Sequence, residues 1–199
     1  ILASNPNSTE RARADYLRGL LLAAREQREA AARVWQEIEN GPVSPTRVLA
    51  TLARVDLMLQ DRRISQTDAV AVLERLRYAW RGDALEFRVL ARLGRLLLET
   101  RDYRGGLSKL REGIGLYPNH PDAAAVTEEM RAAFMRYWTE GDSERAPPVA
   151  AIALFDEFRD LLPQDQRGEQ IVRKVVDRLI GLDLLDRAAT LLDAQMRFR

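Results

Sequence analysis

The side chains best suited to catalysis in this chain are few, and they form no recognisable constellation. The single histidine, His120, lies between Asn119 and Pro121, in a segment typical of a turn between helices. Serine-based catalysis normally pairs a serine with a histidine base and an orienting acid, and no serine elbow accompanies His120. We therefore expect His120 to be an ordinary turn residue, and we predict no catalytic residues and no enzyme activity.

Metal and cofactor chemistry also lack the residues they need. The chain has no cysteine and one histidine, whereas a structural zinc site uses several nitrogen or sulfur ligands. The glycine pair Gly105-Gly106 and the pair Gly113 and Gly115 lack the strand-before, helix-after setting of a dinucleotide loop, and no Gly-Lys-Ser or Gly-Lys-Thr is present. The sequence predicts neither a metal site nor a cofactor.

Arginines supply the one polar pattern with the spacing of a binding surface. Arg88, Arg92, Arg95 and Glu99 follow i, i+4, i+7, i+11 spacing within a helix expected from about Ala84 to Glu99, so they share one helix face. Guanidinium groups in a groove bind carboxylates through paired, charge-assisted hydrogen bonds. The stripe predicts contact with an acidic protein or peptide, and an ordinary solvated face is the alternative.

The composition describes a folded chain without a strong electrostatic field. Of 199 residues, 46% are hydrophobic and 31% are charged, far too apolar a balance for intrinsic disorder. The net charge of +1 leads us to predict no nucleic-acid partner. Every apolar run is shorter than the roughly 20 residues that span a bilayer, so we predict a soluble chain without membrane insertion. Cytoplasm and periplasm both fit a chain without cysteine, which leaves the localisation unknown.

Small and large apolar residues recur in pairs that are one helical turn apart. The pairs are Ala31 and Trp35, Ala69 and Leu73, Gly106 and Leu110, Ala151 and Phe155, and Ala188 and Leu192. Subtraction of the residue numbers of the small members gives separations of 38, 37, 45 and 37. A small residue lets a second helix approach closely, and the large residue fills the wider space beyond it. The pattern predicts an all-α stack of helical hairpins.

The repeat places five hairpins in one segment that covers residues 1–199. Their ranges are about 11–40, 45–80, 84–117, 122–162 and 167–199. Ser65 and Asp102 lie four residues before Ala69 and Gly106, where second helices need N-caps. The polar stretch 139–148 accounts for the one longer separation, and we expect an enlarged loop there.

The three tryptophans, Trp35, Trp80 and Trp138, each lie on or beside an apolar helical stripe. We predict that they pack in the core or at hairpin ends. An aromatic ligand box is the alternative.

Residues 87–120 resemble one repeat of the tetratricopeptide (TPR) family. The positions that carry the resemblance are Leu93-Gly94, Leu97, Asp102-Tyr103, Gly106, Leu110 and Pro118. The chain departs from the family in its longer period and in the glycines at Gly106 and Gly113. Similarity to a bacterial-type TPR protein implies an α-solenoid, a right-handed superhelix whose first helices line a concave surface. It also implies that Arg88 and Arg95, with Arg13 and Tyr16 of the first hairpin, occupy positions that contact ligand.

Three functional classes stay open on the sequence. The first is a non-catalytic scaffold that binds a protein or peptide partner in the concave groove. The second is a structural spacer or self-assembly segment, which stacks through apolar terminal helices that no polar capping helix covers. The third is a regulatory domain of an enzyme whose catalytic part lies elsewhere. The apolar residues of the last helix lead us to expect that the protein continues beyond Arg199.

Overall fold

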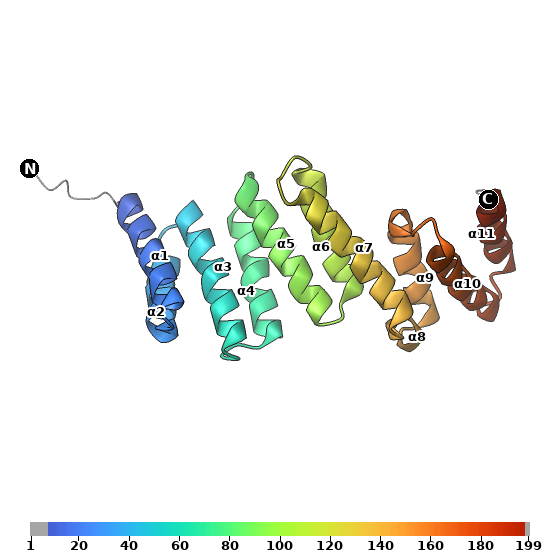
Figure 1. Cartoon of the computed structure of the whole chain (residues 1–199), viewed down its shortest axis with the longest axis horizontal. Coiled ribbons are helices and arrows are strands. Elements are labelled where there is room, and N and C mark those ends of the chain that lie inside the picture. The colour runs from blue at the N-terminus through green and yellow to red at the C-terminus, as the bar shows by residue number, and fades with distance from the viewer. Residues whose placement is uncertain (1–7, 198–199) are drawn as a thin grey trace, which may run out of the picture. The chain divides into compact units, whose positions relative to one another are not determined.

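The computed structural model describes residues 8–197, and this part of the chain consists of helices joined by short connections (Figure 1). The helices are α1 (Ser8–Ala24), α2 (Arg28–Glu39), α3 (Pro45–Gln60), α4 (Gln66–Ala79), α5 (Ala84–Glu99), α6 (Tyr103–Leu116), α7 (Ala123–Thr139), α8 (Asp142–Arg145), α9 (Pro148–Glu157), α10 (Gln166–Gly181) and α11 (Leu185–Arg197), with a 3-10 turn, η1 (Arg159–Leu161), before α10. No strand occurs between residues 8 and 197. The predicted all-α class is confirmed.

The chain forms two compact units, which meet in the sequence between Ala123 and Ala124. Unit 1 contains α1 to α6. The boundary falls after Ala123, the first residue of α7, so unit 2 contains α7 from Ala124 onwards and the helices from α8 to α11. Each unit has its own set of fully buried side chains, such as Leu73 in unit 1 and Phe155 in unit 2.

Side-chain caps begin the second helices where the sequence predicts them. The Ser65 side chain accepts a hydrogen bond from the backbone of Asp68, whose carboxylate in turn accepts from the Ser65 backbone, so the two residues form a capping box. Asp102 accepts from the backbone N–H of Gly105 and caps α6. Both predicted N-caps are confirmed.

Four of the five small-plus-large pairs are buried. Trp35, Leu73, Leu110 and Phe155 are each 2% exposed or less. Leu192 on α11 differs, because 41% of its surface is exposed although its small partner Ala188 is buried.

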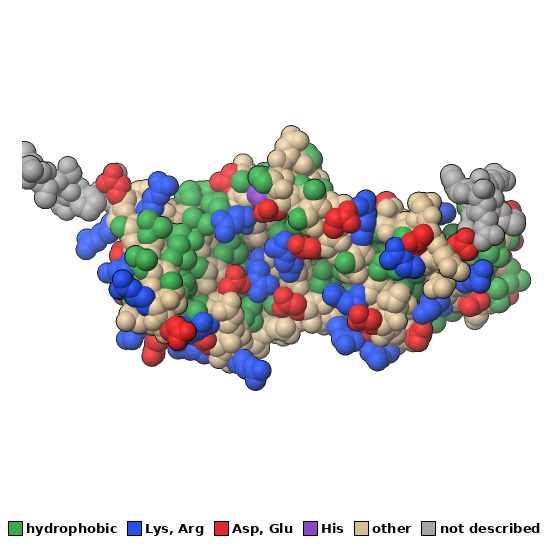
Figure 2. Space-filling view, viewed as in Figure 1, with side chains coloured by type: hydrophobic (Ala, Val, Ile, Leu, Met, Phe, Trp, Pro, Cys, Tyr) green, Lys and Arg blue, Asp and Glu red, His purple; other side chains and the backbone are tan. Residues whose placement is uncertain are grey.

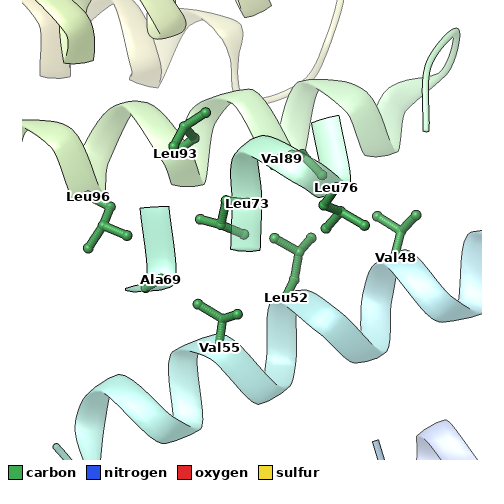
Figure 3. Close-up of a cluster of buried hydrophobic side chains, with 9 residues drawn as sticks. All are labelled: Val48, Leu52, Val55, Ala69, Leu73, Leu76, Val89, Leu93 and Leu96. Atoms are coloured by element: carbon green, nitrogen blue, oxygen red, sulfur yellow. The ribbon is translucent and has the colours of Figure 1, made fainter. Parts of the chain in front are cut away.

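The cluster around Leu73 shows what buries a large member of a pair (Figure 3). Leu73 and Ala69 of α4 lie between α3 and α5, in contact with residues from both helices. The cluster consists of Val48, Leu52, Val55, Ala69, Leu73, Leu76, Val89, Leu93 and Leu96. The second helix of one hairpin is therefore covered by the first helix of the next.

Two glycines bring the backbones of α5 and α6 together. A Cβ added to Gly106 would lie 2.6 Å from a side-chain atom of Leu98 and 2.8 Å from the carbonyl oxygen of Gly94. A Cβ on Gly94 would lie 2.7 Å from Leu110. The departure from the TPR pattern at Gly106 thus has a local cause, since no room remains for a methyl group.

The long interval before Ala151 folds instead of forming an open loop. Gly141 has φ 85°, and this left-handed residue precedes the single turn α8, in which Asp142 and Ser143 are buried. Arg178 of α10 donates a hydrogen bond to the carbonyl oxygen of Ser143, and Lys174 donates one to the carbonyl oxygen of Trp138. The carbonyl groups at the end of α7 and in the turn α8 thereby gain partners that an open loop would take from water.

Candidate binding groove

The polar stripe of α5 consists of Arg88, Arg92, Arg95 and Glu99. It lies beside α3, the first helix of the preceding hairpin, which Arg92 contacts through Asp56. Arg92 Nε is 2.5 Å from Asp56 Oδ1, and its Nη1 is 3.5 Å from Glu99 Oε1. Only 20% of the Arg92 side chain is exposed. Arg92 is therefore already bound to two carboxylates of the same chain.

Arg88 is the exposed arginine of the stripe. Among residues 8–197 its side chain has neither an ion pair nor a hydrogen bond. Its guanidinium group is therefore able to bind a carboxylate from another molecule. Arg95 is half-buried and has an interaction partner of its own within the chain.

The arginines surround a hollow with an apolar floor, which we call the α3–α5 hollow. Its volume is about 160 Å³. Leu52, Phe87 and Ala91 are its buried apolar residues. The polar lining residues are Arg88, Arg92, Arg95, Asp56 and Asp122. Its accessible lining is mainly polar, so the hollow suits a small group that carries a carboxylate.

A second hollow, of about 440 Å³, continues along the same two helices. It shares Asp56 and Arg92 with the first and adds Glu99. Over the region of α5, Figure 2 shows Lys and Arg side chains interspersed with Asp and Glu. The surface is mixed in charge, with Arg88 as a cation whose charge no neighbour neutralises.

The structure brings together only some of the residues that the sequence singles out. Arg88, Arg92 and Arg95 line one hollow, and Glu99 joins Arg92 in the next. Arg13 is exposed on α1 and lines neither hollow. Tyr16 is half-buried against the cluster around Trp35, and its carbonyl oxygen accepts a hydrogen bond from Trp35 Nε1 at 3.3 Å. Tyr16 therefore contributes mainly to packing.

The two acidic residues of the hollow, Asp56 and Asp122, are not among those that the sequence singles out. Asp56 precedes Arg92 by 36 residues, which is close to one repeat period. Opposite charges about one period apart are a signal for this pair, because first helices of neighbouring hairpins lie close to each other.

His120 supports the floor of the α3–α5 hollow. Its ring stacks on Phe87 with centroids 3.9 Å apart and an interplanar angle of 17°. The backbone N–H of Asp122 donates to His120 Nδ1 at 3.1 Å. The histidine lies in a turn, as predicted, and it also holds a floor residue in place.

A buried carboxylate fixes the start of α5. Glu86 Oε2 accepts hydrogen bonds from the Gly82 backbone N–H at 2.7 Å and from the Tyr117 hydroxyl at 2.6 Å. Burial and this hydrogen bond to Glu86 raise the pKa of Tyr117 to about 12. The contact ties the end of α6 to the first turn of α5. Arg88 lies on the same helix, in its second turn.

Trp35 and Trp138 are buried, as the sequence predicts, and Trp80 is half-buried with its Nε1 2.8 Å from Asp83 Oδ1. Within residues 8–197 no three His, Asp or Glu side chains come together in a group that could hold a metal ion. No helix of this part is long and apolar enough to cross a membrane.

The comparisons with known proteins identify the fold. Two solved structures of nearly identical TPR-like repeats, from a Podosopora anserina protein named after the kinesin light chain, match almost the whole chain. One of them covers 97% of each chain with a TM-score of 0.53, and the other, a variant of the same repeats, covers 94% of each with the same score; identity is 13% in both. No family model matches the sequence, and no curated protein matches it. The fold is TPR-like, as the residues from Leu93 to Pro118 predict.

Proposed function

We propose that the chain is a non-catalytic protein-interaction module that binds an acidic peptide segment along α3 and α5. The observation that carries the proposal is the α3–α5 hollow, whose apolar floor lies beside the exposed and unpaired Arg88. A charged side chain without a partner next to buried apolar surface favours a ligand that offers both a carboxylate and an apolar group.

The internal ion pairs of the hollow limit what it binds. Asp56 already occupies Arg92 at 2.5 Å, so an incoming carboxylate competes with it there and meets no such competition at Arg88. Asp56 and Asp122 also repel a ligand whose acids fall in the wrong places. A partner with acids in register with Arg88 and an apolar residue over Phe87 is therefore preferred to a uniformly acidic chain.

The test uses an array of extended peptides in which the number and spacing of acidic residues and the presence of one apolar residue vary. We expect the protein to bind a subset that contains both, with affinity that falls as salt increases. Arg88→Glu should weaken binding to that subset by about tenfold or more, which corresponds to about 1.4 kcal/mol.

Arg75→Glu is the matched control. Arg75 is an exposed arginine of the second helix α4 and has no ion pair among residues 8–197, so the substitution makes the same charge change away from the hollow. The proposal fails if the two variants lose affinity equally, or if no peptide in the array binds the wild-type protein.

A further inference from the structure

Helix α1 exposes an apolar stripe, and two of its residues are equivalent to residues that α5 buries. Ala14, Leu17, Leu21 and Ala24 are all exposed and follow i, i+3, i+7, i+10 spacing, which is the seam of a helix that packs on another helix. Leu17 is 53% exposed and Leu21 is 61% exposed. A stripe of this kind is rarely left open to water without a partner.

The repeat indicates what kind of element covers such a stripe. Trp35 and Leu110 are equivalent large members of their pairs and lie 75 residues apart, so Ala14 and Leu21 correspond to Val89 and Leu96. By the same offset Leu17 and Ala24 correspond to Arg92 and Glu99 of the polar stripe, so only Ala14 and Leu21 have buried counterparts. Val89 and Leu96 are fully buried in the cluster that contains Leu73 of α4. The occupant that fits the stripe of α1 is therefore the second helix of a hairpin.

The chain itself has a second helix whose large member is open. Leu192 of α11 is 41% exposed, whereas its four equivalents are 2% exposed or less. Leu185 lies two turns earlier on the same face and is 55% exposed. The exposed face of α1 therefore lacks contact with a second helix, and the exposed face of α11 lacks contact with a first helix.

The charges beside the two stripes are opposite. Arg11 and Arg18 are exposed along one side of the α1 stripe, although Arg18 also pairs with Asp15 at 3.3 Å. Asp186 and Asp193 are exposed beside Leu185 and Leu192. Among residues 8–194, whose side chains the structure describes, neither aspartate has an ion pair. Two α1 helices would place arginines against arginines, so α1 against α11 is favoured over α1 against α1.

We propose that α1 of one copy packs against α11 of a second copy, so that the chain associates head to tail through Leu17 and Leu21 on one side and Leu185 and Leu192 on the other. Such a contact joins two different surfaces and leaves one of each free, which allows further copies to add. It does not involve the α3–α5 hollow.

The decisive experiment combines two variants, each with one damaged surface. Leu21→Asp retains an intact α11, and Leu192→Asp retains an intact α1. The wild-type protein should increase in mass with concentration above 22.6 kDa in sedimentation. Each variant alone should associate at least about tenfold more weakly, because an interface would bury an unpaired carboxylate. An equimolar mixture should form dimers and stop there.

Leu116→Asp is the control for the surface change, because Leu116 of α6 is 54% exposed and lies outside both stripes. We expect it to associate like the wild type, and circular dichroism should show native helix content in all three variants. The proposal is overturned if the wild type stays at 22.6 kDa at every concentration, if either single variant assembles normally, or if the mixture fails to dimerise.

Discussion

At the scale of single residues, the Glu86–Tyr117 contact shows how one hydrogen bond positions the proposed binding helix. Glu86 is 7% exposed and accepts from two donors, so the charge is solvated by the protein instead of by water. Because of the same contact, the free energy of unfolding should fall as the pH becomes strongly alkaline. The folded pKa of Tyr117, about 12, lies above the ordinary value of about 10.

We predict that Tyr117→Phe lowers the free energy of unfolding by about 1–2 kcal/mol at neutral pH, because Glu86 loses a buried donor. A raised phenol pKa contributes stability that is complete below about pH 10 and is lost as the pH rises towards 12. The difference between wild type and variant should therefore shrink over that range. Urea unfolding at several pH values measures it, and a constant difference from neutral pH upwards would contradict the assignment.

At the scale of elements, the crossing of α5 and α6 depends on the absence of two methyl groups. We predict that Gly106→Ala destabilises the protein by about 1–3 kcal/mol, because the new Cβ meets Leu98 and the backbone of Gly94. This outweighs the gain of about 1 kcal/mol that alanine has over glycine in a helix.

Gly115→Ala is the matched control on the same helix. A Cβ at Gly115 meets nothing within 4 Å, so this variant should be as stable as the wild type or up to about 1 kcal/mol more stable. Thermal unfolding followed by circular dichroism compares the two. Equal effects of both substitutions would show that helix propensity dominates and that the crossing is loose.

The sequence predicts the elements better than it predicts the surfaces between them. The small-plus-large pairs and the caps at Ser65 and Asp102 are local signals, because each depends on residues within one or two turns. The pairing of Arg92 with Asp56 is a long-range contact, because its two residues lie on neighbouring first helices 36 positions apart. Only the repeat period relates them in the sequence. The exposure of Leu192 does not follow from its pair, whose pattern is the same as that of the four buried equivalents. It follows from the apolar last helix, which the sequence shows without a polar capping helix after it.

At the scale of the whole chain, two compact units with separate cores predict separate responses to damage. Leu73→Ala should lower the stability of unit 1 by about 2–5 kcal/mol through loss of packing and a residual cavity. Hydrogen exchange should accelerate in α3 to α6 and remain unchanged in α10, since repeat proteins couple mainly through neighbouring hairpins.

Phe155→Ala provides the reciprocal test in unit 2. Phe155 is 1% exposed, and its truncation should accelerate exchange in α9 and α10 while α3 to α6 keep their protection. If either substitution accelerated exchange equally throughout residues 8–197, the two units would unfold as one cooperative body.

The positions of the tryptophans give the chain an intrinsic optical reporter. Trp35 and Trp80 precede Ala123, and Trp138 is the only indole of unit 2. Trp138 is fully buried and lies beneath the guanidinium group of Arg178 at 5.5 Å, so its fluorescence should shift to the red when water reaches it. Replacement of Trp35 and Trp80 by phenylalanine would leave an emission signal that belongs to unit 2 alone.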